Sequence, residues 1–459
     1  MSHNFPARES AMDRLERMDR PVGRPDVGSR PSGDPAAQLA LSVVFPGLAT
    51  IRRSPVLGLW TFLAGVALPF VVFAWWFANR DRLVGVTFDR RFLLAVVITA
   101  AFVVLARLVA VAEVGAAHRA APGTGALTSV ATLVVVAMAV PITIVAQEAY
   151  EARGVVGDVF GTELDVPLFV PLAGVPADDD VTNILLFGGD GGPGRWGMRS
   201  DTMILAIVHE SSGRMGLVSI PRNLTSLRFP PGTPLADRYP DGFDDLTNAV
   251  FSAVNADQAL RDHYGAGGLQ AEPLALSEGL GYSLGIEVDD FALVNMAGFA
   301  DVVDAVGGVV VELGNNIPLP PSPPDVPPVP MTIGPGLVEM DGALALAYVR
   351  TRSADSDYER MARQRQMLAA LGSQVSATEA LAAFSTVTGV LGDAMRTSMS
   401  SGEFGDLLDR FGDNAAIVES VGLTPPLIEP GDPDYAQIAA IVEAVRTAVV
   451  SGVPSGYTR

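Results

Sequence analysis

The sequence contains no cysteine, no lysine and only four histidines, and each shortage excludes a class of chemistry. Without cysteine there are no disulfides, zinc–thiolate sites or thiol nucleophiles. The histidines do not have the spacing of a metal-ligand pair or a catalytic triad: His3, His118, His209 and His263. The chain has 51 acidic against 31 basic residues and a net charge of −20, which argues against nucleic acid as a partner.

Because lysine is absent, arginine alone carries the positive charge of the side chains. It gathers in two short stretches, Arg199-Ser200-Asp201-Thr202 and Tyr348-Val349-Arg350-Thr351-Arg352. Arginine forks match phosphate oxygens bidentately and stay charged at any working pH. Carboxylates beside them can hold a hard cation such as Mg²⁺. The combination indicates a site for a metal-bound phosphate or pyrophosphate.

Three long apolar runs precede the acidic part of the chain, at residues 56–77, 92–112 and 126–146. Each is close to the roughly 20 residues that span a bilayer. We therefore expect a membrane region at residues 39–147, after a disordered cytoplasmic tail at 1–38. The apolar run Leu39 to Ile51 is short and contains Pro46-Gly47, so we interpret it as interfacial or re-entrant.

The arrangement across the membrane depends on the number of spans. Three spans place the arginine-rich tail inside and the C-terminal domain outside, in agreement with the positive-inside rule. The loop from Asn79 to Arg91 opposes this, because its four arginines would then lie outside, and four spans would reverse the conclusion. We expect three spans, hence a multi-pass protein of the cell membrane with an extracytoplasmic C-terminal domain.

The rest of the chain divides into a polar stalk at 148–180, a domain at 181–450 and a tail at 451–459. Apolar runs predict a buried strand at Val181–Phe187, a hairpin of Thr202–Val208 with Met215–Ile220, and a strand at Gly308–Leu313. Helices are predicted at 245–262 and 272–284. From Leu337 a helix is predicted, then a short strand ending the apolar run Ala343–Val349, a turn, a helix at 358–375, and further helices to the C-terminus. Prolines fill more than half of Pro318 to Pro330, which predicts an exposed extended insertion. This mixture is typical of an α/β or α+β domain.

Two short motifs are set aside. The segment from Gly189 to Gly194 satisfies the dinucleotide pattern G-x-G-x-x-G, but no room remains for the helix that must follow it. Asp355-Ser356-Asp357 matches the D-x-D pattern of many glycosyltransferases, yet no nucleotide-sugar fold is visible. Neither motif therefore identifies a nucleotide site.

The charged residues that remain fall at predicted strand ends and on one helix. Arg199 with Asp201, and Arg350 with Arg352, are two apart, so on extended backbone each pair shares a face. Arg222 follows the second hairpin strand. Asp357 precedes a helix on which Arg360 and Gln364 lie on one face, whereas Arg363 and Arg365 turn elsewhere and are predicted to be solvated. The alternatives are surface ion pairs and an ordinary charged helix start.

Several of these motifs, in this order, resemble the LytR–CpsA–Psr family. The matching blocks are Asn183 to Asp190, Arg199 to Thr202, Ser219 to Arg222, Leu246 to Ala249 with Asn248, Val306 to Val309, and Ala347 to Arg352 continuing through Asp357, Arg360 and Gln364. The resemblance covers residues 181–372 closely. From 373 to about 450 the chain resembles, more loosely, the C-terminal helices of actinobacterial members.

The resemblance implies an α-β-α sandwich with a central mixed sheet, preceded by transmembrane helices. It implies an extracytoplasmic, membrane-anchored phosphotransferase that moves a glycopolymer from a polyprenyl-pyrophosphate carrier onto peptidoglycan with Mg²⁺ (or Mn²⁺). Lipid of the membrane is then a further partner. Two rivals remain open: a non-catalytic polyprenyl-pyrophosphate-binding or regulatory protein, and a lipid pyrophosphatase.

The resemblance also implies roles for single residues. Asp190 and Asp201 resemble the metal-binding carboxylates. Arg199, Arg222, Arg350 and Arg352 resemble catalytic members of the pyrophosphate-binding set, with Arg360 and Gln364 as substrate-binding members and Asp357 as support. Where the family usually reads Pro-Arg-Asp, this chain has Asn223, which keeps hydrogen bonding but cannot act as a general base. Either that acid is dispensable, or this chain is weakened or altered in acceptor use.

Overall fold

The computed structural model describes residues 33–79, 89–160, 180–189, 200–265, 270–321, 328–352, 356–375, 395–411 and 416–457. Most of the predicted tail, the stalk from residue 161 to 179, Asp190, Arg199 and Asp355 lie outside these ranges. The described chain forms two compact units, Met1–Val71 with Thr99–Thr143, and Val72–Ile98 with Ile144–Arg459.

Among the described residues, three helical segments are long and apolar enough to cross a membrane: Pro55–Ala78, Arg90–Ala117 and Thr124–Val159. The first consists of α3 (Pro55–Phe62), a π-helical turn η1 (Leu63–Ala67) and α4 (Leu68–Ala78), and the others are α6 and α7. Each contains one of the three predicted runs. α7 continues through Val159, so the first part of the predicted stalk is helical.

The first unit contains α2 (Pro35–Val44), α3, η1 and parts of α6 and α7. Leu39 and Val43 of α2 pack against Val111 and Val114 of α6. Asp34 begins α2 as an N-cap that accepts the N–H of Ala36. The short apolar run of this region is thus a separate helix followed by turns, in keeping with its proline and glycine.

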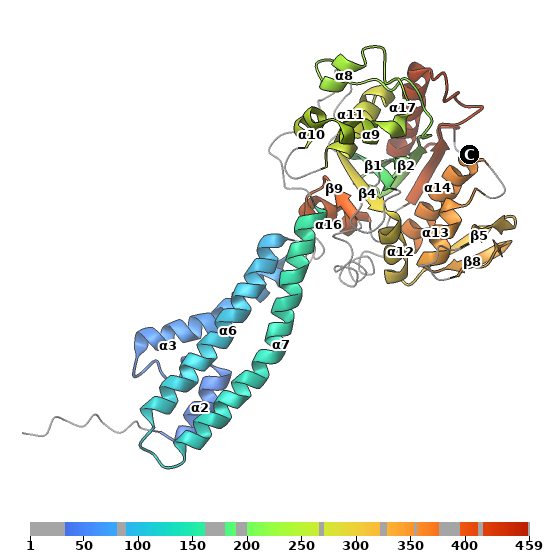
Figure 1. The fold of residues 1–459 in the computed structure, drawn as a ribbon. Coiled ribbons are helices and arrows are strands. Elements are labelled where there is room, and N and C mark those ends of the chain that lie inside the picture. Colours follow the sequence, from blue (N-terminus) through green and yellow to red (C-terminus); the bar gives the residue numbers. More distant parts are fainter. Residues whose placement is uncertain are drawn as a thin grey trace, which may run out of the picture. The chain divides into compact units, whose positions relative to one another are not determined.

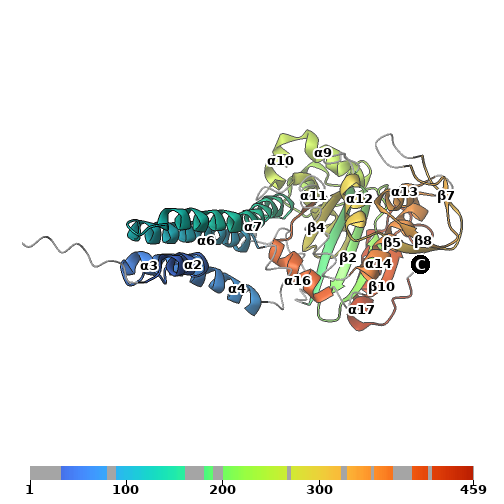
Figure 2. The same cartoon turned by 90° about the horizontal axis from the view of Figure 1, so that it is seen from below.

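The second unit contains a six-stranded mixed sheet in the order β10-β3-β2-β1-β4-β9 (Figures 1 and 2). β1 is parallel to β4, β3 is parallel to β10, and the remaining neighbours are antiparallel. The strands of this sheet are β1 (Val181–Gly189), β2 (Ser200–His209), β3 (Arg214–Ser219), β4 (Asp290–Asn295), β9 (Met395–Thr397) and β10 (Ala416–Gly422). The predicted hairpin is confirmed, but β9 and β10 fall where only helices were predicted.

Helices cover both faces of the sheet, which confirms the predicted α-β-α sandwich (Figure 1). One face packs against α9 (Val250–Ala256), α11 (Ala271–Leu284) and α17 (Tyr435–Ser451), and the other against α14 (Asp357–Gln374) and α16 (Ser401–Phe411). The shorter helices are α8 (Pro234–Arg238), the 3₁₀ turn η3 (Thr247–Ala249) and α10 (Gln258–Tyr264). Alternate residues of β1 face the two cores, Leu185 one and Ile184 the other, because strand side chains alternate.

A second, smaller core lies between α14 and a two-stranded sheet of β5 (Val309–Leu313) and β8 (Gly336–Met340). It includes α12 (Met296–Ala305) and α13 (Gly342–Arg350), and a short ladder of β6 (Ile317–Pro318) with β7 (Thr332–Ile333). The predicted strand at Ala343–Val349 is wrong, because these residues form α13. Its apolar positions Ala345, Tyr348 and Val349 are spaced at three to four residues and face this core, which is a helical period.

The end of α7 is fixed to the sheet within the second unit. The ring of Phe160 lies 5.2 Å from that of Phe404 in α16, centroid to centroid. Phe160 also forms a parallel bridge with Thr397 of β9. Val156 and Val159 are buried in the same apolar cluster. The last residues of α7 therefore pack on α16 and β9 inside the second unit.

Candidate pyrophosphate site

The site lies at the edge of the sheet where β1, β3, β4 and β10 end and β2 begins. Ligands of α/β sheets bind at the carboxyl ends of the parallel strands. Asp201 is the second residue of β2, and Arg222 follows β3 by three residues. Arg222 Nη1 donates to Asp201 Oδ1 at 2.8 Å. The backbone N–H of the buried Asn248, in η3, donates to the carbonyl of Arg222 at 3.4 Å. This hydrogen bond helps to fix the backbone of Arg222.

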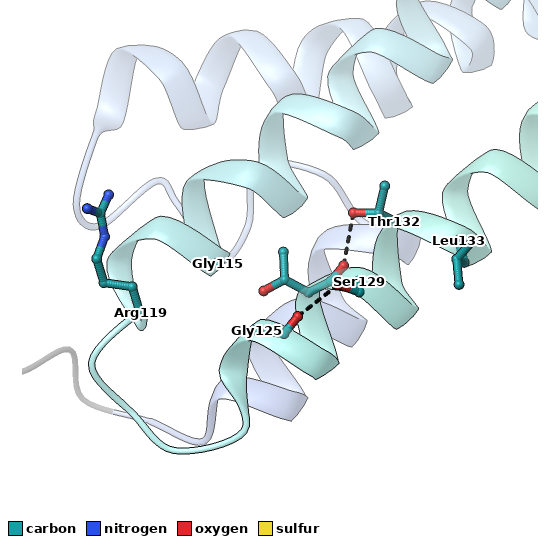
Figure 3. A pocket seen from close by; sticks show the side chains of 7 residues that line it. Gly115, Arg119, Gly125, Ser129, Thr132 and Leu133 are labelled. Carbon is teal, nitrogen blue, oxygen red and sulfur yellow. Dashed lines mark hydrogen bonds between the residues drawn. The ribbon is translucent and has the colours of Figure 1, made fainter.

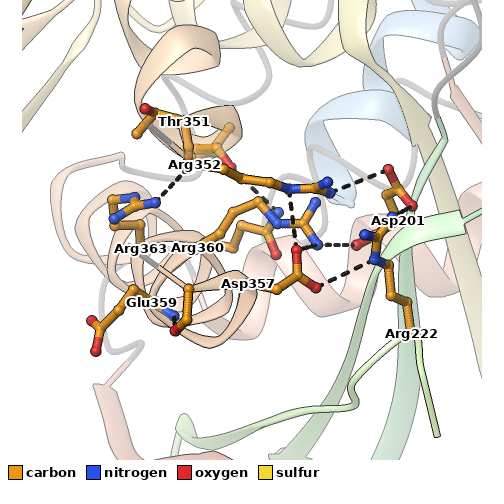
Figure 4. Close-up of polar contacts among 11 residues, drawn as sticks. Asp201, Arg222, Thr351, Arg352, Asp357, Glu359, Arg360 and Arg363 are labelled. Atoms are coloured by element: carbon orange, nitrogen blue, oxygen red, sulfur yellow. Dashed lines mark hydrogen bonds and ion pairs between the residues drawn. The ribbon is translucent and has the colours of Figure 1, made fainter. Parts of the chain in front are cut away.

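The loop after α13 brings Arg352 to the same place, 3.6 Å from Asp201 Oδ2 through its Nη2 (Figure 4). Arg350 is the last residue of α13 and is exposed; within the described ranges its side chain has no ion pair or hydrogen bond. The sequence predicted that Arg350 and Arg352 share a face of extended backbone. This prediction is wrong, because Arg350 belongs to a helix and Arg352 to the loop after it. Arg352 reaches Asp201 because the chain leaves the helix at Thr351.

Asp357 is the centre of the cluster, since its carboxylate contacts three arginines (Figure 4). Oδ2 lies 3.3 Å from Arg222 Nε. Oδ1 lies 3.1 Å from Arg352 Nε and 3.0 Å from Arg360 Nη2. Asp357 occupies the first turn of α14, where the helix dipole also favours a negative charge. The supporting role that the resemblance implied for it agrees with this geometry.

Arg360 is the buried member of the cluster, with a side chain only 5% exposed. Its Nη2 also donates to the backbone carbonyl of Asp201 at 3.1 Å. Burial lowers the pKa of Arg360, and the charges of Asp357 and Asp201 act in the opposite direction. Its Nε is buried and has no hydrogen-bond partner in the described part of the chain. A buried donor without an acceptor is costly, which is typical of a site that is completed by a ligand.

Arg222 keeps its charge firmly. Burial alone would lower the pKa of Arg222, but its hydrogen bond to Asp201 and the charges of Asp201 and Asp357 outweigh burial and raise it. Arg222 and Arg352 remain 31% and 42% exposed, so solvent or a ligand reaches both. Three arginines and two aspartates leave a charge of +1 on an otherwise strongly acidic chain. The arrangement can bind an anion that carries several oxygens.

Two further residues of α14, Arg363 and Arg365, are not solvated as the sequence predicted, and Gln364 beside Arg363 contacts the end of α13. Gln364 is buried and donates Nε2 to the carbonyl of Val349 at 3.4 Å, so it holds the end of α13. Arg363 and Arg365, predicted to be solvated, are 5% and 6% exposed. Arg365 donates to Ser420 Oγ on β10, and burial lowers its pKa to about 10. The prediction failed because α14 packs on β10 and α13, neither of which the sequence had revealed.

The carboxylate of Asp201 is the donor type that Mg²⁺ prefers. Both its oxygens already face arginines, and the described ranges contain no group of three acidic or histidine side chains that could hold an ion. One carboxylate fits part of a magnesium site, and the second predicted ligand, Asp190, lies outside the described residues together with Arg199. A metal at this position stays a prediction.

The first unit has an open groove between the end of α6 and the start of α7 (Figure 3). Its hydroxyl groups are used within the helix: Ser129 Oγ donates to the carbonyl of Gly125 at 3.0 Å, and Thr132 Oγ1 to that of Thr128 at 2.9 Å. Gly115 lies so close to Thr128 that an added Cβ would approach its hydroxyl to 2.6 Å. These features serve close helix packing and do not form a second anion site.

Comparison with known proteins gives one family. The model of the LytR_cpsA_psr family matches residues 162–426, more than half of the chain. Similar curated proteins include Biofilm regulatory protein A of Streptococcus mutans, 27% identical over 49% of this chain and 52% of the relative. Polyisoprenyl-teichoic acid–peptidoglycan teichoic acid transferase TagU of Oceanobacillus iheyensis is 28% identical over 51% of this chain and 64% of the relative. The probable cell wall biosynthesis protein LcpB of Corynebacterium glutamicum is 34% identical over 42% of this chain and 37% of the relative.

The matched part thus spans between 37% and 64% of these relatives' lengths. Among solved structures, TagV of B. subtilis aligns with a TM-score of 0.42 at 22% identity, over 62% of this chain and 100% of that chain. A TM-score this low adds no argument to the family match.

Proposed function

The chain belongs to the LytR_cpsA_psr family, and from this premise we propose that it is a membrane-anchored phosphotransferase. Its substrate would be a glycopolymer on a polyprenyl-pyrophosphate carrier, and its acceptor a hydroxyl of peptidoglycan. One observation carries the proposal: Arg222, Arg352 and Arg360 converge on Asp357 at the carboxyl edge of the sheet. The names of TagU and LcpB, which refer to teichoic acid transfer and cell wall biosynthesis, support the substrate class.

In the proposed reaction the arginines bind the pyrophosphate oxygens. The acceptor hydroxyl oxygen attacks the phosphorus that carries the sugar, the bond to the polyprenyl phosphate breaks, and the hydroxyl proton passes to solvent or to the leaving phosphate. Negative charge then grows on the leaving phosphate, where Arg352 and Arg222 can stabilise it without moving. The transition state of phosphoryl transfer needs positioning and charge stabilisation more than a strong base, so Asn223 is compatible with turnover.

A divalent cation on Asp201 and Asp190, Mg²⁺ or Mn²⁺, belongs to the same proposal. When bound, it would neutralise charge on the pyrophosphate. Arg222 and Arg352 hold the Asp201 carboxylate in place in the described state. The three apolar helices of the described residues suit a substrate whose lipid tail stays in the bilayer, with the domain outside the cell.

The experiment is a transfer assay with full-length protein in nanodiscs, a labelled polyprenyl-pyrophosphate glycan and isolated peptidoglycan. Label that becomes covalently attached to peptidoglycan supports the proposal, and Arg352→Ala should abolish it. Release of free glycosyl phosphate without an acceptor would instead identify a lipid pyrophosphatase. Binding without any turnover would identify a binding or regulatory protein, and either result would reject the transferase.

A further inference from the structure

Thr351 separates the two arginines of the α13–α14 loop, and all three of its hydrogen-bonding groups are engaged. Its N–H donates to the carbonyl of Ala347 at 3.0 Å, and its Oγ1 donates to that of Pro318 at 2.6 Å. Its own carbonyl accepts from Arg363 Nη2 (Figure 4). Thr351 is 2% exposed, with φ −59° and ψ 139°, so the chain turns there from helix to extended backbone.

Arg363 is itself held firmly. It is 5% exposed, and its guanidinium carbon lies 6.0 Å from the centroid of the Tyr348 ring. The hydroxyl of Tyr348 donates to Gln366 Oε1 at 2.7 Å, and Gln366 Nε2 donates to the carbonyl of Glu312 at 2.8 Å. The attraction between a buried guanidinium and the face of an aromatic ring favours one position of the arginine side chain. α14 therefore holds the end of α13 through a series of fixed side chains.

The fixed backbone of Thr351 sets the direction in which Arg352, the next residue along the chain, leaves the loop. Its Nε and Nη2 reach Asp357 and Asp201, but its side chain is 42% exposed, so packing alone does not hold it. The backbone direction at Thr351 decides whether that guanidinium reaches the cluster. Arg363 Nη2 donates to the Thr351 carbonyl, the backbone group that directly precedes Arg352.

We propose that Arg363 is a positioning residue for the reaction, which acts through Thr351 on Arg352 and does not touch the pyrophosphate itself. This proposal rests on the proposed function, since it assigns how one arginine of that site is oriented. Pre-organised side chains matter here because a shift of about 1 Å can cost roughly 100-fold in rate.

The test is a double-mutant cycle on full-length protein in nanodiscs, with inorganic pyrophosphate and Mg²⁺ as the probe and calorimetric Kd as the readout. Arg363→Met should weaken binding about tenfold in the parent. In an Arg352→Ala background the same change should weaken it less than about twofold, because the residue it positions is gone. Arg363→Lys, which can still donate to Thr351, should recover much of the loss. Arg238→Met, in an exposed ion pair with Asp257, is the matched control and should bind like the parent.

Equal effects of Arg363→Met in the two backgrounds would overturn the inference, as would normal binding by Arg363→Met. Circular dichroism and thermal unfolding check that each variant is folded. If Arg363→Met does not fold, the cycle is completed with Arg363→Lys, whose smaller loss must likewise vanish in the Arg352→Ala background. If the parent protein does not bind pyrophosphate, the proposed function is wrong. If the parent binds but the two backgrounds show equal effects, only the positioning role of Arg363 is wrong.

Discussion

Arg360 Nη2 donates to the backbone carbonyl of Asp201, 159 residues earlier in the chain, while it also contacts the carboxylate of Asp357. This one side chain ties the first turn of α14 to the start of β2. Because Arg360 is almost fully buried, the tie is part of the fold as well as of the site. Mutations in the cluster should therefore affect stability and activity to different extents, depending on exposure.

Replacing Arg360 by Met should destabilise the domain markedly. The change leaves the Asp201 carbonyl without its donor and removes the buried one of the three arginines on Asp357, which costs about 2 to 3 kcal/mol in the free energy of unfolding. Thermal and denaturant unfolding of the full chain measure this. Arg238→Met removes a pair with Asp257 that is 49% and 33% exposed, and should cost less than about 1 kcal/mol. Equal losses in the two variants would contradict the buried role of Arg360.

Arg222→Lys should retain the fold but lose transfer activity. A lysine has a single ammonium and cannot bridge the two carboxylates that Arg222 contacts, Asp201 through Nη1 and Asp357 through Nε. We expect a loss of roughly 100-fold in kcat, as for removal of one transition-state donor. The transfer assay measures it, with Arg238→Lys as the control. If Arg222→Lys keeps the parental kcat, the bridge from Arg222 to Asp201 and Asp357 is not needed for transfer.

Asn223→Asp tests whether the missing acid matters. If charge stabilisation by the arginines dominates, restoring a carboxylate should change kcat by less than about threefold. A gain of more than tenfold would show that turnover in this chain is limited by a general base. The pH–rate profile of the variant distinguishes the two, since a new base would add an ionisation to it.

The pH dependence of stability should report on Asp290 in β4. Burial raises its pKa to about 7; the hydrogen bond from Ser398 opposes this, and the charges of Glu403 and Asp289 add to it. Burial likewise raises the pKa of Asp289 to about 6. Folded protein therefore keeps protons that the unfolded chain loses near pH 4, and stability should fall as pH rises from about 4 to about 7, then level off. Each carboxyl contributes a slope of up to about 1.4 kcal/mol per pH unit.

Asp290→Asn removes one of these ionisations and can still accept from Ser398 Oγ, which lies 2.8 Å from Asp290 Oδ1. The variant should lose part of the slope and be more stable than the parent at pH 8. Chemical denaturation at pH 4, 6 and 8 checks this. An unchanged slope would mean that Asp290 is ionised in the folded state at low pH, contrary to its buried position.

The sequence predicted the members of the site better than the way they meet. Asp201, Arg222, Arg352, Asp357 and Arg360 were all selected from spacing and resemblance, and the structure brings them together. The pairing of Arg350 with Arg352 failed because the seven residues Ala343–Val349, with several alanines and leucines, fit a short buried strand and a helix equally well.

Residues that depend on tertiary packing could not be found from local patterns. Arg363 looked solvated because its helix was judged without knowledge of α13, whose end it holds. β9 and β10 were missed because β9 has three residues and β10 is only partly buried, so neither has a long apolar alternation. Thr351 carried no signal beyond its place between two arginines, although its N–H, hydroxyl and carbonyl are all hydrogen-bonded.

The most direct test of the central claim is mass spectrometry of lipids that co-purify with the full-length protein, before and after addition of a polyprenyl pyrophosphate with Mg²⁺. The account predicts that the parent retains polyprenyl pyrophosphate or phosphate, and that Arg222→Ala and Arg352→Ala lose it while Arg238→Ala keeps it. Retention of the same lipids by all four proteins would contradict the arginine cluster as the pyrophosphate site.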